Sequence, residues 1–249
     1  MDNLKILGVC LVVLVQSCST YRQADIRRSL QDAGEITAVC PDAVNYLPGY
    51  PSFDDKEAFF NDSLQYSRGK ALRETERGEQ AVEDADHRLE FYLSRFGEVL
   101  GVELSTEATP AVAKYIKEAY TFARSGIGNA KKAYKRERPF SYFEEQSSIP
   151  QDEERFGHFT SYPSGHALRG WVIALAFISI DEEHRYDIIK VGYELGQSRV
   201  ISGYHFQSDV DAARLCASVG YASIVSDPEF IKLQNLARKE LAALRAGKK

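Results

Sequence analysis

Apolar residues recur every three to four positions from about residue 54 to the C-terminus of this chain. This is the period of amphipathic helices, and runs that alternate apolar and polar residues, as strands do, are nearly absent. The pattern predicts an all-α fold: a single compact helical domain over residues 46–249, without internal repeats. Helices are expected over residues 52–69, 70–99, 106–122, 129–138, 164–180, 183–202, 205–225 and 228–245. Residues 140–163 lack a clear period and are expected to form a long loop.

The first 18 residues differ from the rest of the chain. Lys5 precedes an apolar run over residues 6–15 that ends in polar and small residues, as in an export signal. The run is shorter than the roughly 20 apolar residues that span a bilayer. The position of Cys18 resembles a lipoprotein cleavage site that leaves an acylated cysteine, although Gln16 is unusual there. Secretion without an anchor and a buried N-terminal element are the alternatives. The polar residues 19–45 are expected to form a tether.

The overall charge is acidic, with a formal net charge of −5 and a pI near 5.6. This argues against nucleic acid as a general partner, because nucleic-acid binding favours a basic surface. Any anion must therefore be held by a local cluster of cations. After export, Cys40 and Cys216 remain, and the sequence leaves open whether they form a disulfide or stay as free thiols. Their spacing predicts no zinc site.

Three short segments carry side chains suited to binding and cleaving a tetrahedral oxyanion. They contribute Lys131 and Arg138, then Ser164, Gly165 and His166, and finally Arg199, His205 and Asp209. Arginine offers a planar fork that matches two phosphate oxygens, whereas lysine acts as a point charge. The second segment precedes an apolar helix, and the N–H groups at a helix N-terminus favour an anion.

Each segment also has a simpler interpretation. Lys131 and Arg138 lie two helical turns apart and can share a face, which could be a solvated basic face together with Lys132, Lys135 and Arg136. Ser164 could be an ordinary N-cap. His205 and Asp209 are one turn apart, so the carboxylate can orient the imidazole, but they could also form a surface pair. The remaining histidines are interpreted as surface residues, with His158 a weak site candidate: His87, His158 and His184.

The three motifs resemble those of the type 2 phosphatidic acid phosphatase superfamily, which includes the vanadium haloperoxidases. They read Lys-x6-Arg-Pro, Pro-Ser-Gly-His and Ser-Arg-x5-His-x3-Asp here. Within this superfamily, the chain resembles the class A non-specific acid phosphatases. The resemblance includes the stretch over residues 160–167 and extends over roughly residues 40–225. Thr160 and Ala167 depart from that family's pattern.

The resemblance implies roles for each motif residue. Lys131, Arg138, Arg199, Ser164 and the Gly165 backbone would bind the phosphate. His205 would attack phosphorus, Asp209 would orient it, and His166 would protonate the leaving oxygen. The resemblance also implies hydrolysis of small phosphomonoesters with broad specificity, through a phosphohistidine and without a metal or other cofactor. The export signal and Cys18 predict a periplasmic or outer-membrane-anchored protein.

Other functions share parts of this pattern. A vanadate-dependent haloperoxidase would use the same cluster, and a non-catalytic phosphate-binding lipoprotein would bind the anion without turnover. A phosphotransferase would pass the phosphoryl group to an alcohol instead of water. The expected partners are small phosphomonoesters and inorganic phosphate, with membrane contact only through a lipid on Cys18, and a homodimer is compatible with the sequence.

Overall fold

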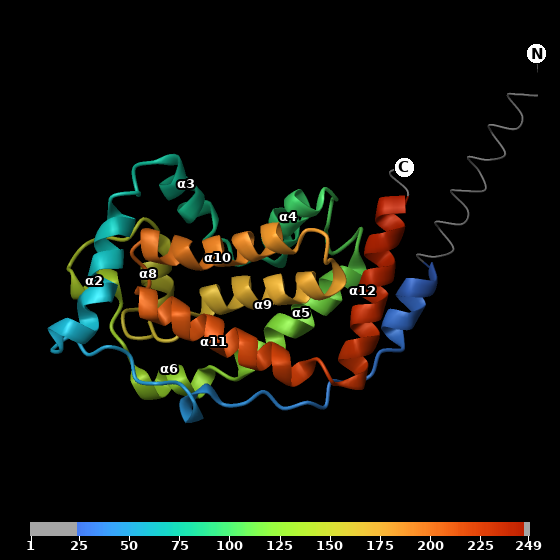
Figure 1. Ribbon diagram of the computed structural model, residues 1–249, viewed down its shortest axis with the longest axis horizontal. Coiled ribbons are helices and arrows are strands. Elements are labelled where there is room, and N and C mark those ends of the chain that lie inside the picture. The colour runs from blue at the N-terminus through green and yellow to red at the C-terminus, as the bar shows by residue number, and fades with distance from the viewer. Residues whose placement is uncertain (1–23, 247–249) are drawn as a thin grey trace, which may run out of the picture.

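A computed structural model describes residues 24–246 (Figure 1). These residues form helices and no strand, which confirms the all-α prediction. The predicted export signal and Cys18 lie outside the described residues. No helix within residues 24–246 is long and apolar enough to cross a membrane.

The central element is α9 (Gly165–Ile180), which packs against α5 (Pro110–Ser125), α10 (Arg185–Ile201), α11 (Gln207–Ile224) and α12 (Pro228–Ala246) (Figure 1). Apolar residues surround α9 on almost every side, the pattern of a helix buried within a domain. Because its N-terminal turn begins inside the molecule, polar groups at that end face protein or a cavity and not bulk solvent.

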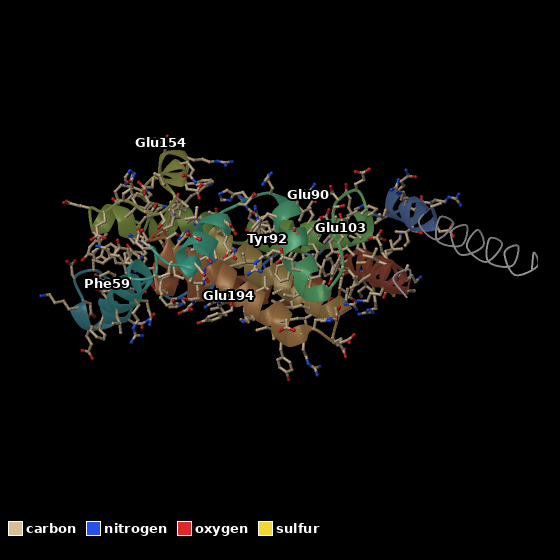
Figure 2. The ribbon with its side chains drawn as sticks, turned by 90° about the horizontal axis from the view of Figure 1, so that it is seen from above. Phe59, Glu90, Tyr92, Glu103, Glu154 and Glu194 are labelled. Atoms are coloured by element: carbon tan, nitrogen blue, oxygen red, sulfur yellow. The ribbon has the colours of Figure 1, made fainter. Side chains whose placement is uncertain are left out.

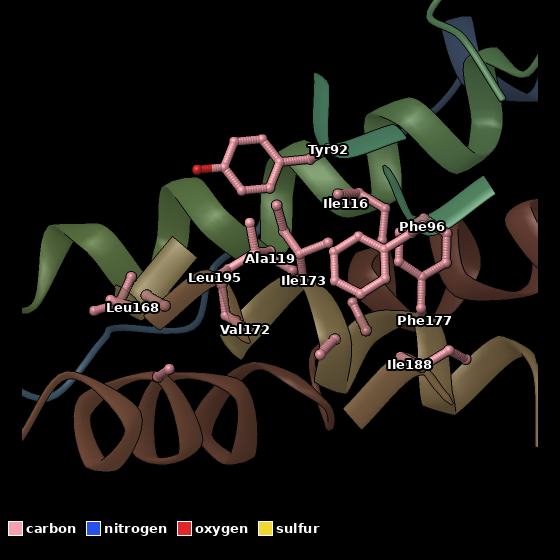
Figure 3. Close-up of a cluster of buried hydrophobic side chains, with 14 of the residues drawn as sticks. Tyr92, Phe96, Ile116, Ala119, Leu168, Val172, Ile173, Phe177, Ile188 and Leu195 are labelled. Carbon is pink, nitrogen blue, oxygen red and sulfur yellow. The ribbon is translucent and has the colours of Figure 1, made fainter. Parts of the chain in front are cut away.

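The main apolar cluster lies between α9 and its neighbours, including α4 (Leu89–Leu100). The Phe96 and Phe177 rings stack with centroids 5.0 Å apart. Figure 3 shows Tyr92 beside this cluster, with its hydroxyl directed away from the two phenylalanines. The apolar core thus holds Tyr92 in place while its polar end reaches a different environment.

Residues 70–99 form two helices and not one continuous stretch. These are α3 (Glu76–Glu83) and α4, and the turn between them contains Asp84 and Asp86. The Asp86 carboxylate accepts a hydrogen bond from the Arg88 N–H (2.7 Å), a local bond that competes with helix formation. The helix before this pair, α2 (Lys56–Lys70), agrees with the sequence pattern.

The segment between the first two motifs also differs from the prediction. The helix expected over residues 129–138 is α6 (Gly128–Tyr134), which ends where Lys135 adopts a left-handed conformation with φ 46°. The expected loop contains α7 (Pro139–Tyr142) and α8 (Pro150–Phe156). Both helices begin with proline at the first position, where a missing N–H costs nothing. They are too short for apolar periodicity to indicate them.

The described part of the expected tether packs against the domain. Residues 24–31 are helical, and Ile26 contacts Ala111 and Leu236. The Thr37 and Ala38 N–H groups donate to Asp227 Oδ2 at 2.9 and 3.0 Å. A short 3-10 helix (Ala43–Asn45) follows. From residue 24 onward this segment is therefore part of the folded body.

Cys40 and Cys216 are both free thiols. Cys216 is buried on α11, and burial raises its pKa to about 11. Burial also raises the pKa of Cys40. Both side chains are therefore protonated at neutral pH and behave as small apolar groups.

Candidate active site

A cavity of about 580 Å³ opens at the N-terminal end of α9. Six of the eight motif residues line it: Lys131, Arg138, Gly165, His166, Arg199 and His205. Ser164 and Asp209, the other two, are fully buried and adjoin this lining. The three segments predicted from the sequence therefore meet at one place, and the motif residues form one constellation.

His205 lies in the turn between α10 and α11, with its two ring nitrogens in different surroundings. Nδ1 lies 3.5 Å from Asp209 Oδ2 and 3.3 Å from Ser161 Oγ. Nε2 lies 3.0 Å from Arg138 Nη1, which can only donate. Nδ1 therefore carries the proton, and Nε2 presents a lone pair. Burial and the charge of Arg138 hold the pKa of His205 well below its usual value, so this imidazole is neutral.

Asp209 is held by a network behind His205. Its Oδ2 accepts from Ser161 Oγ (2.6 Å) and from the Phe206 N–H (2.8 Å), and the second bond caps α11. Its Oδ1 accepts from Arg136 Nη1 at 2.6 Å. Burial alone would raise the pKa of Asp209, but the charge of Arg136 and the hydrogen bonds from His205 and Ser161 outweigh it. The pKa is held well below the usual range, and the carboxylate stays ionised.

Arg136 is not part of a solvated basic face, as the sequence had suggested. Its side chain is fully buried, and its Nη2 donates to Asp62 Oδ2 at 2.7 Å while Nη1 holds Asp209. The guanidinium carbon lies 4.3 Å from the centroid of the Phe206 ring. Arg136 therefore joins α2, α11 and the segment after α6. Nothing in the spacing of the cations separates it from its exposed neighbours.

Arg138 and Lys131 converge on the cavity from separate elements, not along one helix face. Arg138 precedes α7, and its guanidinium donates to the carbonyl oxygens of Gly157 (3.0 Å) and Tyr204 (3.2 Å). Lys131 on α6 donates to the Thr160 carbonyl oxygen at 2.7 Å. Burial, with a smaller effect of Arg138, lowers the pKa of Lys131 to about 7. A bound dianion would favour the charged amine.

Arg199, near the end of α10, has hydrogen-bond donors that are not used within the described residues. Its Nη2 lies 3.3 Å from Asp152 Oδ2, whereas Nε and Nη1 are buried without a hydrogen-bond partner. A buried guanidinium with two unsatisfied N–H groups is costly unless something else accepts from them. Because Arg199 lines the cavity, an oxyanion there can supply the missing acceptors.

Ser164 and Gly165 begin α9. Ser164 Oγ accepts from the Ala167 N–H at 3.3 Å, so the N-cap interpretation is correct. The hydroxyl proton of Ser164 is not used by that bond. A Cβ at Gly165 would lie 3.8 Å from Lys131 Cε, on the cavity side of the helix. The helix N-terminus is therefore turned toward the cations, where it favours a bound anion.

His166 faces the cavity from the first turn of α9. Its Nε2 lies 2.6 Å from the Asp84 carbonyl oxygen and 2.9 Å from the Tyr92 hydroxyl. A carbonyl oxygen only accepts, so Nε2 carries a proton and Nδ1, which is buried without a partner, is the atom left for proton transfer. Burial, with the nearby charge of Arg199, holds the pKa of His166 well below its usual value.

The Asp84 carbonyl is itself anchored through its side chain. The Asp84 carboxylate accepts from Ser198 Oγ (2.5 Å) and from Gln80 Nε2 (3.0 Å). Ser198 precedes Arg199 in the third motif, yet it contacts Asp84 and not the cavity. These side chains fix the turn between α3 and α4 against α10, and that turn orients His166.

One residue near His166, His87, was not predicted as part of the site. The ring of His87 lies 5.1 Å from that of His166, and its Nε2 lies 3.5 Å from Asp152 Oδ2. His87 therefore lines the cavity and is not a surface residue. The main chain of His158 accepts from the Arg138 N–H (2.8 Å), and its exposed side chain does not line the cavity. His184 pairs with Asp181 outside the site.

The site can bind a tetrahedral oxyanion, attack it with His205 Nε2 and transfer a proton through His166 Nδ1. Lys131, Arg138 and Arg199, the cations of the three motifs, all line the cavity. Within residues 24–246, no cluster of three or more His, Cys, Asp or Glu side chains is arranged to hold a metal ion.

The chain matches the PAP2 superfamily over residues 114–227, which includes all three motifs. It is 42% identical over 188 residues to a non-specific acid phosphatase of Providencia stuartii, covering 75% of this chain and 76% of that protein. A non-specific acid phosphatase of Salmonella typhimurium is 37% identical over 197 residues, 79% of this chain and 78% of the relative. An acid phosphatase of Zymomonas mobilis is 33% identical over 185 residues, 74% and 70% of the two chains. The chain therefore belongs to the non-specific acid phosphatases of the PAP2 superfamily.

Proposed function

We propose that this protein is an acid phosphatase that hydrolyses small phosphomonoesters through a phosphohistidine on His205. The observation that carries the proposal is a neutral imidazole, unprotonated at Nε2, in the lining of a cavity that also contains Lys131, Arg138 and Arg199. A neutral nucleophile beside fixed cations suits attack on a dianionic phosphoryl group.

In the first step, Lys131, Arg138 and Arg199 bind the phosphate oxygens, together with the N–H groups at the start of α9 and the Ser164 hydroxyl. His205 Nε2 attacks phosphorus in line, and an N–P bond forms as the bond to the leaving oxygen breaks. His166 Nδ1 gives its proton to that oxygen. Asp209, through Nδ1 of His205, stabilises the positive charge that develops on the ring.

In the second step, water attacks phosphorus from the side of the departed alcohol. His166 Nδ1 takes the proton of this water, the N–P bond breaks, and phosphate leaves with both histidines restored. Because three protein cations offset the charge of the transferring group, the mechanism proposed here uses no metal ion. An alcohol in place of water would make the same intermediate a phosphotransferase.

The proposed working range is acidic. His166 acts as an acid only when it is protonated, and burial and Arg199 lower its pKa in the empty site. Lowering the pH, or binding a dianion, favours the imidazolium. Catalytic efficiency should therefore rise as the pH falls from neutrality, until the substrate or His205 takes up a proton.

We also propose that the protein is exported and anchored to a membrane by a lipid on Cys18. The support is the apolar run over residues 6–15 and the position of the cysteine behind it. Labelling cells with a radioactive fatty acid and comparing wild type with Cys18→Ser tests the anchor. An unlabelled wild-type protein would contradict it.

The catalytic proposal is tested by p-nitrophenyl phosphate hydrolysis in the presence of EDTA, with wild type and His205→Ala. The wild type should retain its activity in EDTA and be inhibited by vanadate, and the variant should lose activity by at least about 10³-fold. Activity that EDTA abolishes, or that His205→Ala retains, would rule out the mechanism.

A further inference from the structure

The cavity contains more positive charge than one phosphate requires. Its lining includes six cations and no carboxylate among the described residues: Arg124, Lys131, Arg138, Arg155, Arg169 and Arg199. Three of these, Lys131, Arg138 and Arg199, are assigned to the phosphoryl group. The other three are concentrated in one cavity of a protein whose net charge is −5, so this excess does not follow from composition.

The three additional arginines line the same cavity as His166, which would protonate the leaving group. Arg169 donates to the Tyr120 hydroxyl and to the His87 carbonyl oxygen, and its guanidinium carbon lies 4.0 Å from the centroid of the Tyr120 ring. Arg124 Nη1 lies 3.5 Å from the same hydroxyl. Arg169 and Arg124 therefore form one edge of the cavity around Tyr120.

A second edge of the cavity is formed by the end of α8. The guanidinium carbon of Arg155 lies 4.9 Å from the centroid of the Phe156 ring, and Phe156 packs against His87 with centroids 5.2 Å apart. His87 in turn packs against His166. Figure 2 shows Glu154, the residue before Arg155, projecting from α8 away from the body of the molecule. The helix thus presents a cation and a ring to the cavity, while its buried carboxylate, Asp152, pairs with Arg199 and His87 and not with Arg155.

None of these three arginines forms an ion pair with a carboxylate within the described residues, although Arg136 and Arg199, also at the site, both do. Tyr120 and Phe156 add aromatic faces on the two edges. Unpaired arginines with adjacent rings suit a group that is both planar and anionic, since arginine binds carboxylate or phosphate through its fork and rings stack.

We propose that Arg124, Arg155 and Arg169 form a second anion-binding region for the leaving group. The preferred substrates are then phosphomonoesters whose leaving group is planar and carries an additional negative charge. This inference rests on the proposed function, because it places the leaving group beside His166. Beyond the proposed function, we expect the rate to depend on the charge of the leaving group as well as on the phosphate.

Three aryl phosphates of similar leaving-group acidity test the inference: phenyl phosphate, 4-(carboxymethyl)phenyl phosphate and 4-(2-aminoethyl)phenyl phosphate. The quantity measured is kcat/KM for each charged substrate divided by that for phenyl phosphate. An exposed ion pair is worth a factor of about 1.5 to 5, so we expect the carboxylate to be favoured about 5-fold and the amine to be disfavoured. High salt should bring both ratios toward one.

The matched variants are Arg124→Gln with Arg155→Gln, both at exposed positions, and Lys132→Gln as an exposed cation that does not line the cavity. The double variant should lose most of the preference for the carboxylate, and Lys132→Gln should keep it. A wild-type ratio within twofold of one, or an unchanged ratio in the double variant, would overturn the inference. The test of His205→Ala is separate: if that variant hydrolyses phenyl phosphate, the mechanism fails whatever the ratios are.

Discussion

Replacing Arg136 with methionine would leave two buried carboxylates, Asp62 and Asp209, without their shared cation. All three side chains are at most 1% exposed, so water cannot replace the guanidinium. Breaking a buried ion pair by removing one partner costs about 3–5 kcal/mol. Because whole domains are stable by only about 5–15 kcal/mol, we expect a folded but strongly destabilised variant.

The stability lost in Arg136→Met should become smaller as the pH falls. In the wild type the pKa of Asp209 lies below its unfolded value, so this group contributes stability at neutral pH and loses the contribution as the pH falls. Without Arg136, burial would raise the pKa of Asp209, and the carboxyl group would take up a proton more readily. The difference in stability between wild type and variant should therefore be largest near neutral pH and shrink toward about pH 4.5.

Urea denaturation followed by circular dichroism at both pH values measures this difference. Lys132→Met, four residues away and exposed, is the matched control and should change the free energy of unfolding by no more than about 0.5 kcal/mol. A loss below about 1 kcal/mol for Arg136→Met, or an equal loss at both pH values, would refute the reasoning.

Two further predictions concern the site. Sulfate is a dianion at every pH between about 6 and 8, whereas Lys131, whose pKa is about 7, loses its charge over the same range. The inhibition constant of sulfate should therefore rise several-fold from about pH 6 to 8 in the wild type and stay nearly constant in Lys131→Arg. Parallel curves for the two proteins would contradict the role of Lys131 in binding the anion. Ser198→Ala should remove a hydrogen bond to Asp84 that is worth about 1–3 kcal/mol. Because the Asp84 carbonyl orients His166, we expect kcat to fall by about 10-fold and the pH profile of kcat to shift. A destabilised variant whose pH profile is unmoved would mean that Ser198 is structural only.

The sequence predicted those elements whose structure depends on residues close together in the chain. Long helices such as α9 and α11 follow from apolar periodicity, and the N-cap at Ser164 follows from its place before such a run. The short helices α7 and α8 have too few turns to show a period. Their proline starts are compatible with a loop as well as a helix.

The sequence predicted the site residues that belong to motifs. It did not predict those whose role depends on tertiary contacts. His166 and His205 stand in recognisable segments, whereas Asp84 acts through a carbonyl oxygen that any residue would supply. Arg136 is indistinguishable in sequence from the exposed Lys132, because only the packing of α2 against α11 buries it. His87 reaches the cavity from a turn about 80 residues before His166, a proximity that no local spacing encodes.

The central claim, a covalent bond between His205 and phosphorus, is tested most directly by trapping the intermediate. Wild type and His205→Ala would be mixed with a ³²P-labelled aryl phosphate and quenched in alkali within milliseconds, and the labelled peptide would be identified by mass spectrometry. We expect an acid-labile, alkali-stable label on the peptide that contains His205, and no label in the variant. A label on another residue, or one that His205→Ala retains, would contradict it.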